Sequence, residues 1–278
     1  MSMVKGWAIS SLLGFAAVTA SWGATTFSVT DNNSKITLDS VPVPGFNYGG
    51  LIGWEVDAPA AAVSSHLVQQ GYWYRLADSN QEYHFGTLDY LGGTAVGNNI
   101  TVSFRLPDTF VVQLSYNLTG GAPGSGHSLI TETTTFLNLS SAPLALTWFE
   151  FDDFDLNYTV ANDTASGDAT GITQLDTAST VAVSVTHNVT PNAFQISSSS
   201  DPFIIFDILD DNKVDNLANT ITGSQPNDIT FGFQWNLNLT GGQEFSITTT
   251  KLLIPEPTTG LLVLGALCGL GFGLRRRS

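Results

Sequence analysis

The side chains best suited to chemistry lie in one acidic stretch, WFEFDDFDLNYT. Asp153, Asp155 and Asn157 repeat the D-x-D-x-N opening of a calcium loop, in which oxygen atoms converge on a hard cation. Tyr158 stands where such a loop needs glycine and Thr164 where it needs glutamate, so an EF-hand is excluded. The alternatives are an acidic strand end without an ion and a less regular Ca²⁺ site formed by Asp152, Asp153, Asp155 and Asn157. The sequence predicts no other cofactor.

A second acidic cluster follows the apolar run FIIF at residues 203–206. It could join the first cluster in space, but a hydrated loop is the usual setting for such a run of charges. We therefore predict a solvated loop for its members, Asp207, Asp210, Asp211 and Asp215.

Aromatic side chains are concentrated in the stretch GYWYRLA. On a strand, Tyr72 and Tyr74 share one face, while Trp73 and Arg75 share the other. Rings exposed on a sheet would stack on sugar rings, whereas rings on a covered face would belong to the core. Because one face of a sheet is always buried, core packing is the favoured interpretation, and a carbohydrate platform of Tyr72, Trp73 and Tyr74 is the alternative.

The sequence shows no recognisable catalytic motif. Its four histidines have no metal-binding spacing, and no G-x-S-x-G elbow occurs. The single cysteine, Cys268, lies in an apolar run near the carboxyl end, which leaves no thiol nucleophile elsewhere. Any pair among the 24 acidic residues could be nominated as glycosidase carboxylates, so none is selected. We predict that the chain is not an enzyme.

The elements that position these residues are predicted to be strands. Between Thr25 and Leu253, runs such as TFVVQLSYNL and ITFGFQWNLNL alternate apolar with polar residues. Gly, Asn, Asp and Pro separate about twelve or more such runs. The pattern predicts an all-β fold, an antiparallel β-sandwich of jelly-roll or Ig-like type.

Two local features add to this pattern. Residues 57–71 (DAPAAAVSSHLVQQG) begin with a cap residue and end with glycine, which predicts a short helix. The pentapeptide NLTGG occurs at 117–121 and again at 238–242. We interpret both copies as hairpin ends whose glycines supply positive φ angles.

The amino-terminal segment predicts export. Residues 1–24 combine Lys5, a short apolar stretch and small residues, as in a secretory signal peptide. Cleavage after Ala20 and cleavage after Gly23 both fit the small-residue requirement.

The carboxyl-terminal segment predicts a membrane helix. Residues 258–274 carry no charge and, as a helix, would reach about 25 Å, the short limit for crossing a bilayer core. The arginines that follow would remain on the cytoplasmic side. These last 25 or so residues resemble the PEP-CTERM sorting signal of bacterial envelope proteins. The residues that carry the resemblance are Pro255, Glu256, Pro257, Arg275, Arg276 and Arg277.

That resemblance implies an exosortase, a membrane protease-transpeptidase, which clips the tail at or near the Pro-Glu-Pro motif. Ile254 departs from the family by standing where valine is commonest. The alternative is a plain tail-anchored protein with incidental prolines.

Between the two ends, residues 25–253 (the body) carry a net charge near −18. Such a surface repels phosphate backbones, so we predict no nucleic-acid partner. The body lacks cysteine, so its core must hold it together without disulfides. We expect three parts: the signal peptide (1–24), one extracellular β-sandwich (25–253) and the sorting signal (254–278).

These features favour an exported bacterial protein of the cell envelope or exopolysaccharide matrix, with a structural or adhesive role. Its predicted partners are an exosortase, an exopolysaccharide and, before processing, the inner membrane. The alternative is a carbohydrate-binding β-sandwich with bound calcium, and a polysaccharide-modifying enzyme is a third, less favoured interpretation. The ligand, the oligomeric state and the fate after clipping are left open.

Overall fold

The computed structural model describes residues 26–40, 49–57, 65–179, 181–198 and 204–255. The predicted signal peptide and almost all of the predicted sorting signal lie outside these ranges. Within them, none of the helices has the length and apolar character needed to cross a bilayer.

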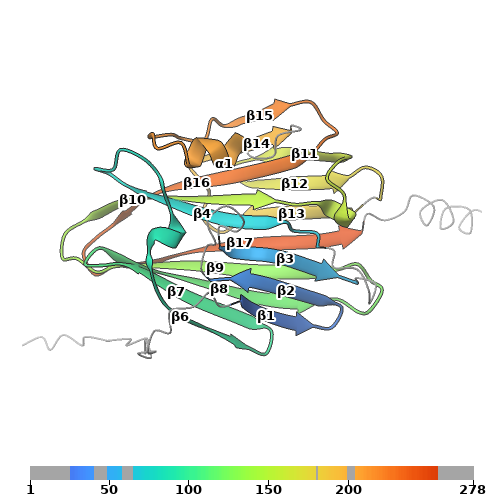
Figure 1. Ribbon diagram of the computed structural model, residues 1–278, viewed down its shortest axis with the longest axis horizontal. Coiled ribbons are helices and arrows are strands. Elements are labelled where there is room, and N and C mark those ends of the chain that lie inside the picture. The colour runs from blue at the N-terminus through green and yellow to red at the C-terminus, as the bar shows by residue number, and fades with distance from the viewer. Residues whose placement is uncertain (1–25, 41–48, 58–64, 180, 199–203, 256–278) are drawn as a thin grey trace, which may run out of the picture.

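The larger layer is an antiparallel sheet of eight strands (Figure 1). In spatial order these are β11 (Asp163–Asp168), β12 (Gly171–Asp176), β13 (Val181–His187), β17 (Glu244–Pro255), β9 (Ser128–Asn138), β8 (Phe110–Gly120), β7 (Asn99–Leu106) and β6 (Asp89–Val96). The last strand of the described chain, β17, therefore lies inside the sheet, between β13 and β9.

The second layer contains a sheet of six strands, antiparallel except for the parallel pair β14–β15. Its order is β15 (Thr220–Gly223), β14 (Ala193–Ser198), β16 (Ile229–Leu239), β10 (Leu144–Asp153), β4 (Gln69–Leu76) and β5 (Tyr83–His84). A three-stranded sheet of β1 (Thr26–Asp31), β2 (Ser34–Asp39) and β3 (Gly50–Val56) contacts β4 through β3 and β8 through β1 and β2. The helical turns are η1 (Phe85–Thr87), η2 (Leu156–Tyr158) and α1 (Ile204–Leu209).

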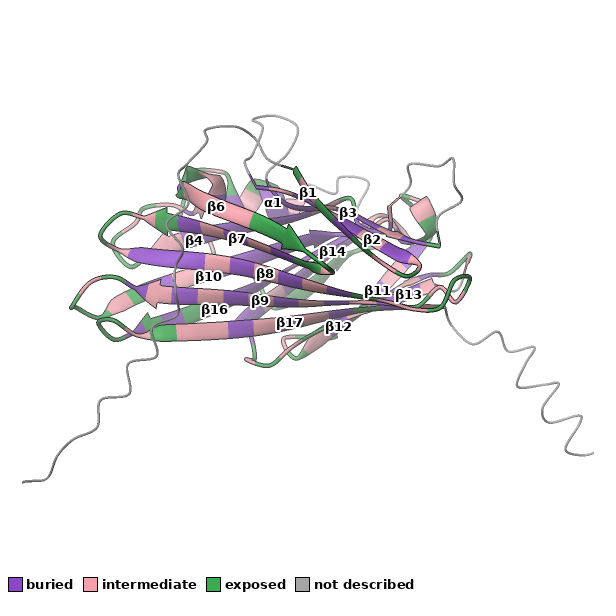
Figure 2. Ribbon diagram, turned by 90° about the horizontal axis from the view of Figure 1, so that it is seen from below, coloured by how far each residue is buried: buried purple, intermediate pink, exposed green. Residues whose placement is uncertain are grey.

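The main core forms where the inner faces of the two layers meet. Every second residue of β8, from Phe110 to Leu118, is at most 1% exposed, and Phe231, Phe233 and Trp235 of β16 belong to the same cluster. Figure 2 shows buried residues along the central strands and exposed residues at the turns. Burial of each large side chain stabilises the fold by about 1.5–3 kcal/mol.

A smaller second core lies on the outer face of the six-stranded sheet, beneath α1. Trp73 of β4 and Phe151 of β10 meet Phe206 of α1 edge-to-face, at centroid distances of 5.2 and 6.3 Å. This core explains why β4 and β10 carry large aromatics on both faces, whereas most strands alternate apolar with polar residues.

The prediction of an all-β antiparallel sandwich is confirmed. The two narrower types do not fit, because sheets of eight, six and three strands exceed the roughly seven to nine strands of an Ig-like fold or jelly roll. β17 continues two residues past the expected end of the body, with Ile254 and Pro255 paired to β13.

Two local predictions need correction. The described part of the predicted helix at 57–71 is not helical, and Gln69–Gly71 already belong to β4. The first NLTGG copy does close a hairpin, between the paired strands β8 and β9. The second joins β16 of one sheet to β17 of the other, so it is a crossover between layers.

The first glycine of each copy allows close backbone approach, because a Cβ on Gly120 would lie 1.9 Å from the carbonyl oxygen of Asp31 and one on Gly241 would lie 2.3 Å from that of Ser141. The copies differ at the second glycine, since Gly242 has φ +72° in the crossover turn and Gly121 has no positive φ.

Candidate functional site

The acidic stretch forms the second half of β10, and its alternation sends neighbouring acids in opposite directions. Phe149 and Phe151 face the second core, while Glu150 and Asp152 face the eight-stranded sheet. Pairing with β16 stays regular to Asp153, where the strand ends. The predicted set of four acidic and amide ligands is therefore split, with Asp152 on the inner face.

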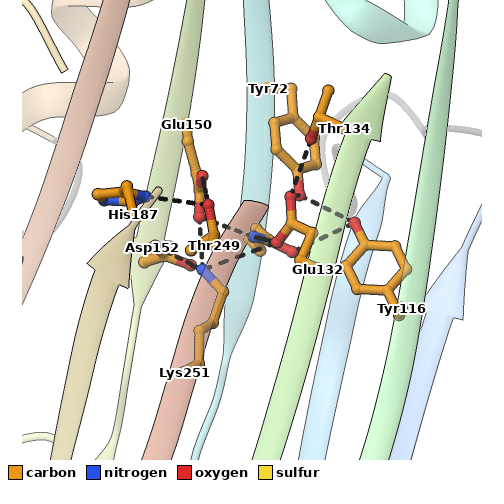
Figure 3. A network of polar contacts seen from close by, with 10 residues as sticks. Tyr72, Tyr116, Glu132, Thr134, Glu150, Asp152, His187, Thr249 and Lys251 are labelled. Atoms are coloured by element: carbon orange, nitrogen blue, oxygen red, sulfur yellow. Dashed lines mark hydrogen bonds and ion pairs between the residues drawn. The ribbon is translucent and has the colours of Figure 1, made fainter. Parts of the chain in front are cut away.

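The inner acids converge on Lys251 of β17 (Figure 3). Its Nζ donates to Glu150 Oε1 at 2.5 Å and to the two oxygens of Asp152 at 2.8 and 3.0 Å. The nearest oxygen of Glu132 lies 3.9 Å from the same nitrogen. All four side chains are at most 2% exposed.

Uncharged groups complete this network. Glu132 accepts hydrogen bonds from the hydroxyl of Tyr72 at 2.5 Å and from the amide of Gln70 at 2.7 Å. The hydroxyls of Tyr72 and Tyr116 lie 2.9 Å apart. Donors and acceptors thus come from β8, β9 and β17 of one sheet and from β4 and β10 of the other (Figure 3).

Burial and neighbouring charges shift the pKa values of the ionisable groups in the network. Burial, reinforced by Glu150, raises the pKa of Glu132 to about 7, and burial also raises the pKa of Asp152. Burial opposes the charge of Lys251, but the surrounding carboxylates outweigh it and raise the pKa of the lysine. Because these acidic side chains are at most 2% exposed, no substrate reaches them in this structure. The network joins the layers and does not form an open active site.

The outer acids form a separate group. Asp153, Asp155 and Asp228 each offer a carboxylate oxygen, and these oxygens lie within 4.8 Å of one another. We call these three residues the acidic triad. Two of its members were predicted as metal ligands from the sequence, and Asp228 was not. Asn157, the fourth predicted ligand, is exposed and does not belong to the triad.

The predicted carbohydrate platform is wrong, because all three rings are buried. Tyr72 and Trp73 are 0% exposed and Tyr74 is 4% exposed. Tyr72 and Tyr74 pack in the main core and Trp73 in the second core, so the favoured interpretation of core packing holds for each. No sugar can stack on them without displacing the core.

The second acidic cluster does not join the first. Asp207 and Asp210 are exposed on and just after α1, and Asp211 pairs with Lys213. Asp215 donates its backbone N–H to Glu82, which also pairs with Arg75. The predicted solvated loop is therefore only partly right, because Asp207 belongs to α1 and Asp211 and Asp215 are half-buried.

A groove of about 330 Å³ opens at the other end of β10, on the outer face of the six-stranded sheet. Thr147 lies opposite both Arg75 of β4 and Asn236 of β16 in the strand register. The remaining wall is formed by Leu76, Ala77, Ser79, Ala145, Leu146, Val214, Leu237 and Asn238.

The polar groups of the groove differ in how firmly they are held. Arg75 contacts Glu82, donates to Asn216 at 2.8 Å and stacks over the Phe149 ring at 5.5 Å. Thr147 donates to Asn236 at 3.2 Å. In the described part of the chain, the side-chain amide of Asn238 makes no hydrogen bond and is exposed.

No protein-family model matches the chain, and no curated protein sequence matches it. Among solved structures, it is similar to a putative aldose 1-epimerase from Escherichia coli K12, with TM-score 0.50 and 8% identity, covering 83% of this chain and 99% of that one. A galactose mutarotase-like protein from Clostridium acetobutylicum gives TM-score 0.47 and 8% identity, covering 82% and 94% of the two chains. A putative aldose 1-epimerase from Klebsiella pneumoniae gives 0.43 and 9%, covering 86% and 82%.

The similarity to the Escherichia coli protein corrects the prediction that the chain is not an enzyme. That prediction relied on the lack of catalytic motifs in the sequence. The fold is one that a putative aldose 1-epimerase uses, so it gives no ground for excluding catalysis. At 8% identity the similarity shows the fold alone.

Proposed function

We propose that the body is a carbohydrate-binding β-sandwich and that the groove beside Asn238 is its binding site. The putative aldose 1-epimerase supports this alternative better than the structural or adhesive role favoured by the sequence, because its fold is used by a protein named for acting on a sugar. The observation that carries the proposal is that the exposed side-chain amide of Asn238, which makes no hydrogen bond within the described chain, lies in a groove large enough for a sugar.

The groove has the chemistry that a sugar needs. Hydroxyl groups both donate and accept hydrogen bonds, and an amide such as that of Asn238 can do both in return. The C–H face of a sugar ring needs apolar contact, which the half-exposed Val214 and the exposed Ala77 and Ala145 offer. A volume near 330 Å³ lies at the lower end of the roughly 300–1,000 Å³ range of small-molecule sites.

The test is binding of the purified protein to a glycan array, followed by titration calorimetry with the best neutral oligosaccharide. Asn238→Leu is expected to weaken binding about tenfold, the effect of one lost hydrogen bond of about 1.4 kcal/mol. The control is Asn117→Leu, the same residue of the other NLTGG copy, which lies on the outer face of the eight-stranded sheet and donates to Asn99 at 2.8 Å.

Binding should survive in the control variant. If no glycan binds to the folded protein, or if both variants bind as tightly as the parent, the groove is not a sugar site. Circular dichroism melting of both variants checks that the sandwich has folded.

We also propose that the chain is exported and that an exosortase clips its tail. This proposal is supported by the order of the Pro-Glu-Pro motif, apolar run and arginines in the sequence. It is compatible with the end of β17 at Pro255, because clipping after that residue leaves the ladder with β13 whole.

A further inference from the structure

The acidic triad joins two parts of the chain that are far apart in sequence, the stretch 153–155 and Asp228. Asp153 is the last residue of β10, Asp155 precedes η2, and Asp228 directly precedes β16. β10 and β16 are paired with Asp153 opposite Thr230, so the end of one strand adjoins the start of the other. This pairing places the carboxylate oxygens within 4.8 Å of one another.

Asp153 is almost fully buried, and one of its carboxylate oxygens lacks a hydrogen bond. The residue is 8% exposed, and the unbonded atom is its Oδ1. Oδ1 of Asp228 is also a buried atom without a hydrogen bond. Leaving such acceptors unpaired is costly, and the cost is larger if the carboxylate is ionised.

No basic side chain compensates for these charges in the described part of the chain. The ion pairs of the lysines and arginines there involve other acids, and Lys251 faces Asp152 on the opposite side of β10. Burial, together with Asp155 and Asp228, raises the pKa of Asp153 well above its ordinary value. Burial and Asp228 raise the pKa of Asp155 to about 6.

We propose that the acidic triad is a divalent-cation site whose ion is Ca²⁺. All three ligand groups are hard carboxylate oxygens, the donor type that Ca²⁺ takes in irregular sites of six to eight ligands. Backbone carbonyls and water would supply the remaining ligands. The ligand set corrects the one predicted from the sequence, since Asp228 replaces Asp152 and Asn157.

The cation would act as a clamp between β10, β16 and the segment leading to η2. It would neutralise the repulsion among the three carboxylates and satisfy the unpartnered oxygens of Asp153 and Asp228. This role is independent of the groove, which uses the opposite end of β10 around Thr147. The site can therefore exist whether or not the groove binds sugar.

The experiment is a thermal melt and a calorimetric titration of the purified full chain with CaCl₂, after removal of metal with a chelator. A dissociation constant of roughly 10⁻⁴–10⁻³ M is expected, as in extracellular calcium modules. Near 10 mM Ca²⁺ the Tm should then rise by about 5 °C. A parallel titration with MgCl₂ should give a smaller shift, because Mg²⁺ requires stricter octahedral geometry.

Two variants that each remove one negative charge distinguish specific Ca²⁺ binding at the triad from general screening of the acidic surface. Asp228→Asn should abolish the Ca²⁺-induced shift and, in chelator, leave the Tm unchanged or higher, because one repelling charge is gone. Asp207→Asn, on the exposed face of α1, should retain the full shift. Asp153→Asn, a second change within the triad, should behave like Asp228→Asn.

Three outcomes would overturn the proposal. One is a folded parent protein whose Tm does not respond to Ca²⁺. Another is an equal response in Asp228→Asn and Asp207→Asn, which would indicate general screening of the acidic surface. A response to Mg²⁺ that exceeds the response to Ca²⁺ would contradict the assignment of the ion.

Discussion

At the residue scale, His66 shows how burial sets a charge state. It is 5% exposed and packs on the Tyr158 ring at a centroid distance of 4.8 Å. Its Nδ1 accepts the backbone N–H of Asn157 at 3.1 Å. Burial lowers the pKa of His66 to about 4, so the folded protein holds a neutral ring at neutral pH.

This environment predicts a loss of stability on acidification. His66 takes up its proton near pH 6.5 in the unfolded chain but only near pH 4 in the folded chain. The stability that the neutral ring of His66 contributes is therefore fully present above pH 6.5 and is lost as the pH falls from 6.5 to 4. The full effect is about 3 kcal/mol. His66→Asn keeps an acceptor in place of Nδ1 and should flatten this part of the profile, measured by urea unfolding from pH 7 to pH 4.

Glu132 and Asp163 contribute with the opposite sign. Burial is the main cause that raises each pKa to about 7, so their stabilisation is lost as the pH rises toward 7. The informative quantity is therefore the difference between variant and parent at each pH. His127→Asn, on an exposed loop, is the control and should follow the parent. A His66 variant that also follows the parent would disprove the assignment.

At the element scale, β10 connects both cores with the buried network. Its outer aromatics pack beneath α1, and its inner acids meet Lys251 on the facing strand β17. Breaking a buried ion pair by removing one partner is strongly destabilising, because the remaining charge stays buried and unpaired.

Lys251→Met should therefore lower the free energy of unfolding by about 3–5 kcal/mol, measured by urea unfolding followed by tryptophan fluorescence. Adding Glu150→Gln and Asp152→Asn removes the orphaned charges and should recover much of this loss. The triple variant keeps the test decisive if the single variant does not fold.

The matched control is Lys35→Met, which removes an exposed lysine paired with Glu55 at 2.9 Å. It should cost less than about 1 kcal/mol. A Lys251 variant that costs no more than this control would mean that the network does not stabilise the sandwich.

The alternation of β10 and β17 also shows what the sequence could reveal. Period two along β10 puts Glu150 and Asp152 on the face opposite Phe149 and Phe151, as in the structure. The same period places Lys251 with Ile247 and Leu253 on an inward face, a signal that could have identified the buried lysine. The period indicates that one face of β4 is buried, but it cannot show that α1 also covers Trp73 on the other face.

Long-range pairing was the other missing information. Asp153 and Asp155 were predicted as ligands because they are close in sequence. Asp228 joins them only because β16 pairs with β10 in one register, and a single sequence does not contain that register. For the same reason the second NLTGG copy, whose turn chemistry is local, did not reveal that its two strands enter different sheets.

At the scale of the whole molecule, the proposed sorting predicts two processed ends. Intact-mass analysis of the protein from its native envelope should give a mass without residues 258–278 and without the first 20 or 23 residues. Glu256→Ala should leave the tail attached, because it alters the proposed cleavage motif. Glu244→Ala, an exposed acid at the start of β17, should be clipped normally. A native mass that retains residues 258–278 would rule out the proposed sorting.

The position of β17 has a consequence for the order of assembly. It is the last strand of the described part of the chain, yet it hydrogen-bonds to β13 on one side and β9 on the other. A nascent polypeptide therefore has a gap in its larger sheet until residue 255 has emerged. During that interval Glu132 and Glu150 lack the ammonium group of Lys251. Ribosomes stalled before codon 251 should thus display a protease-sensitive intermediate.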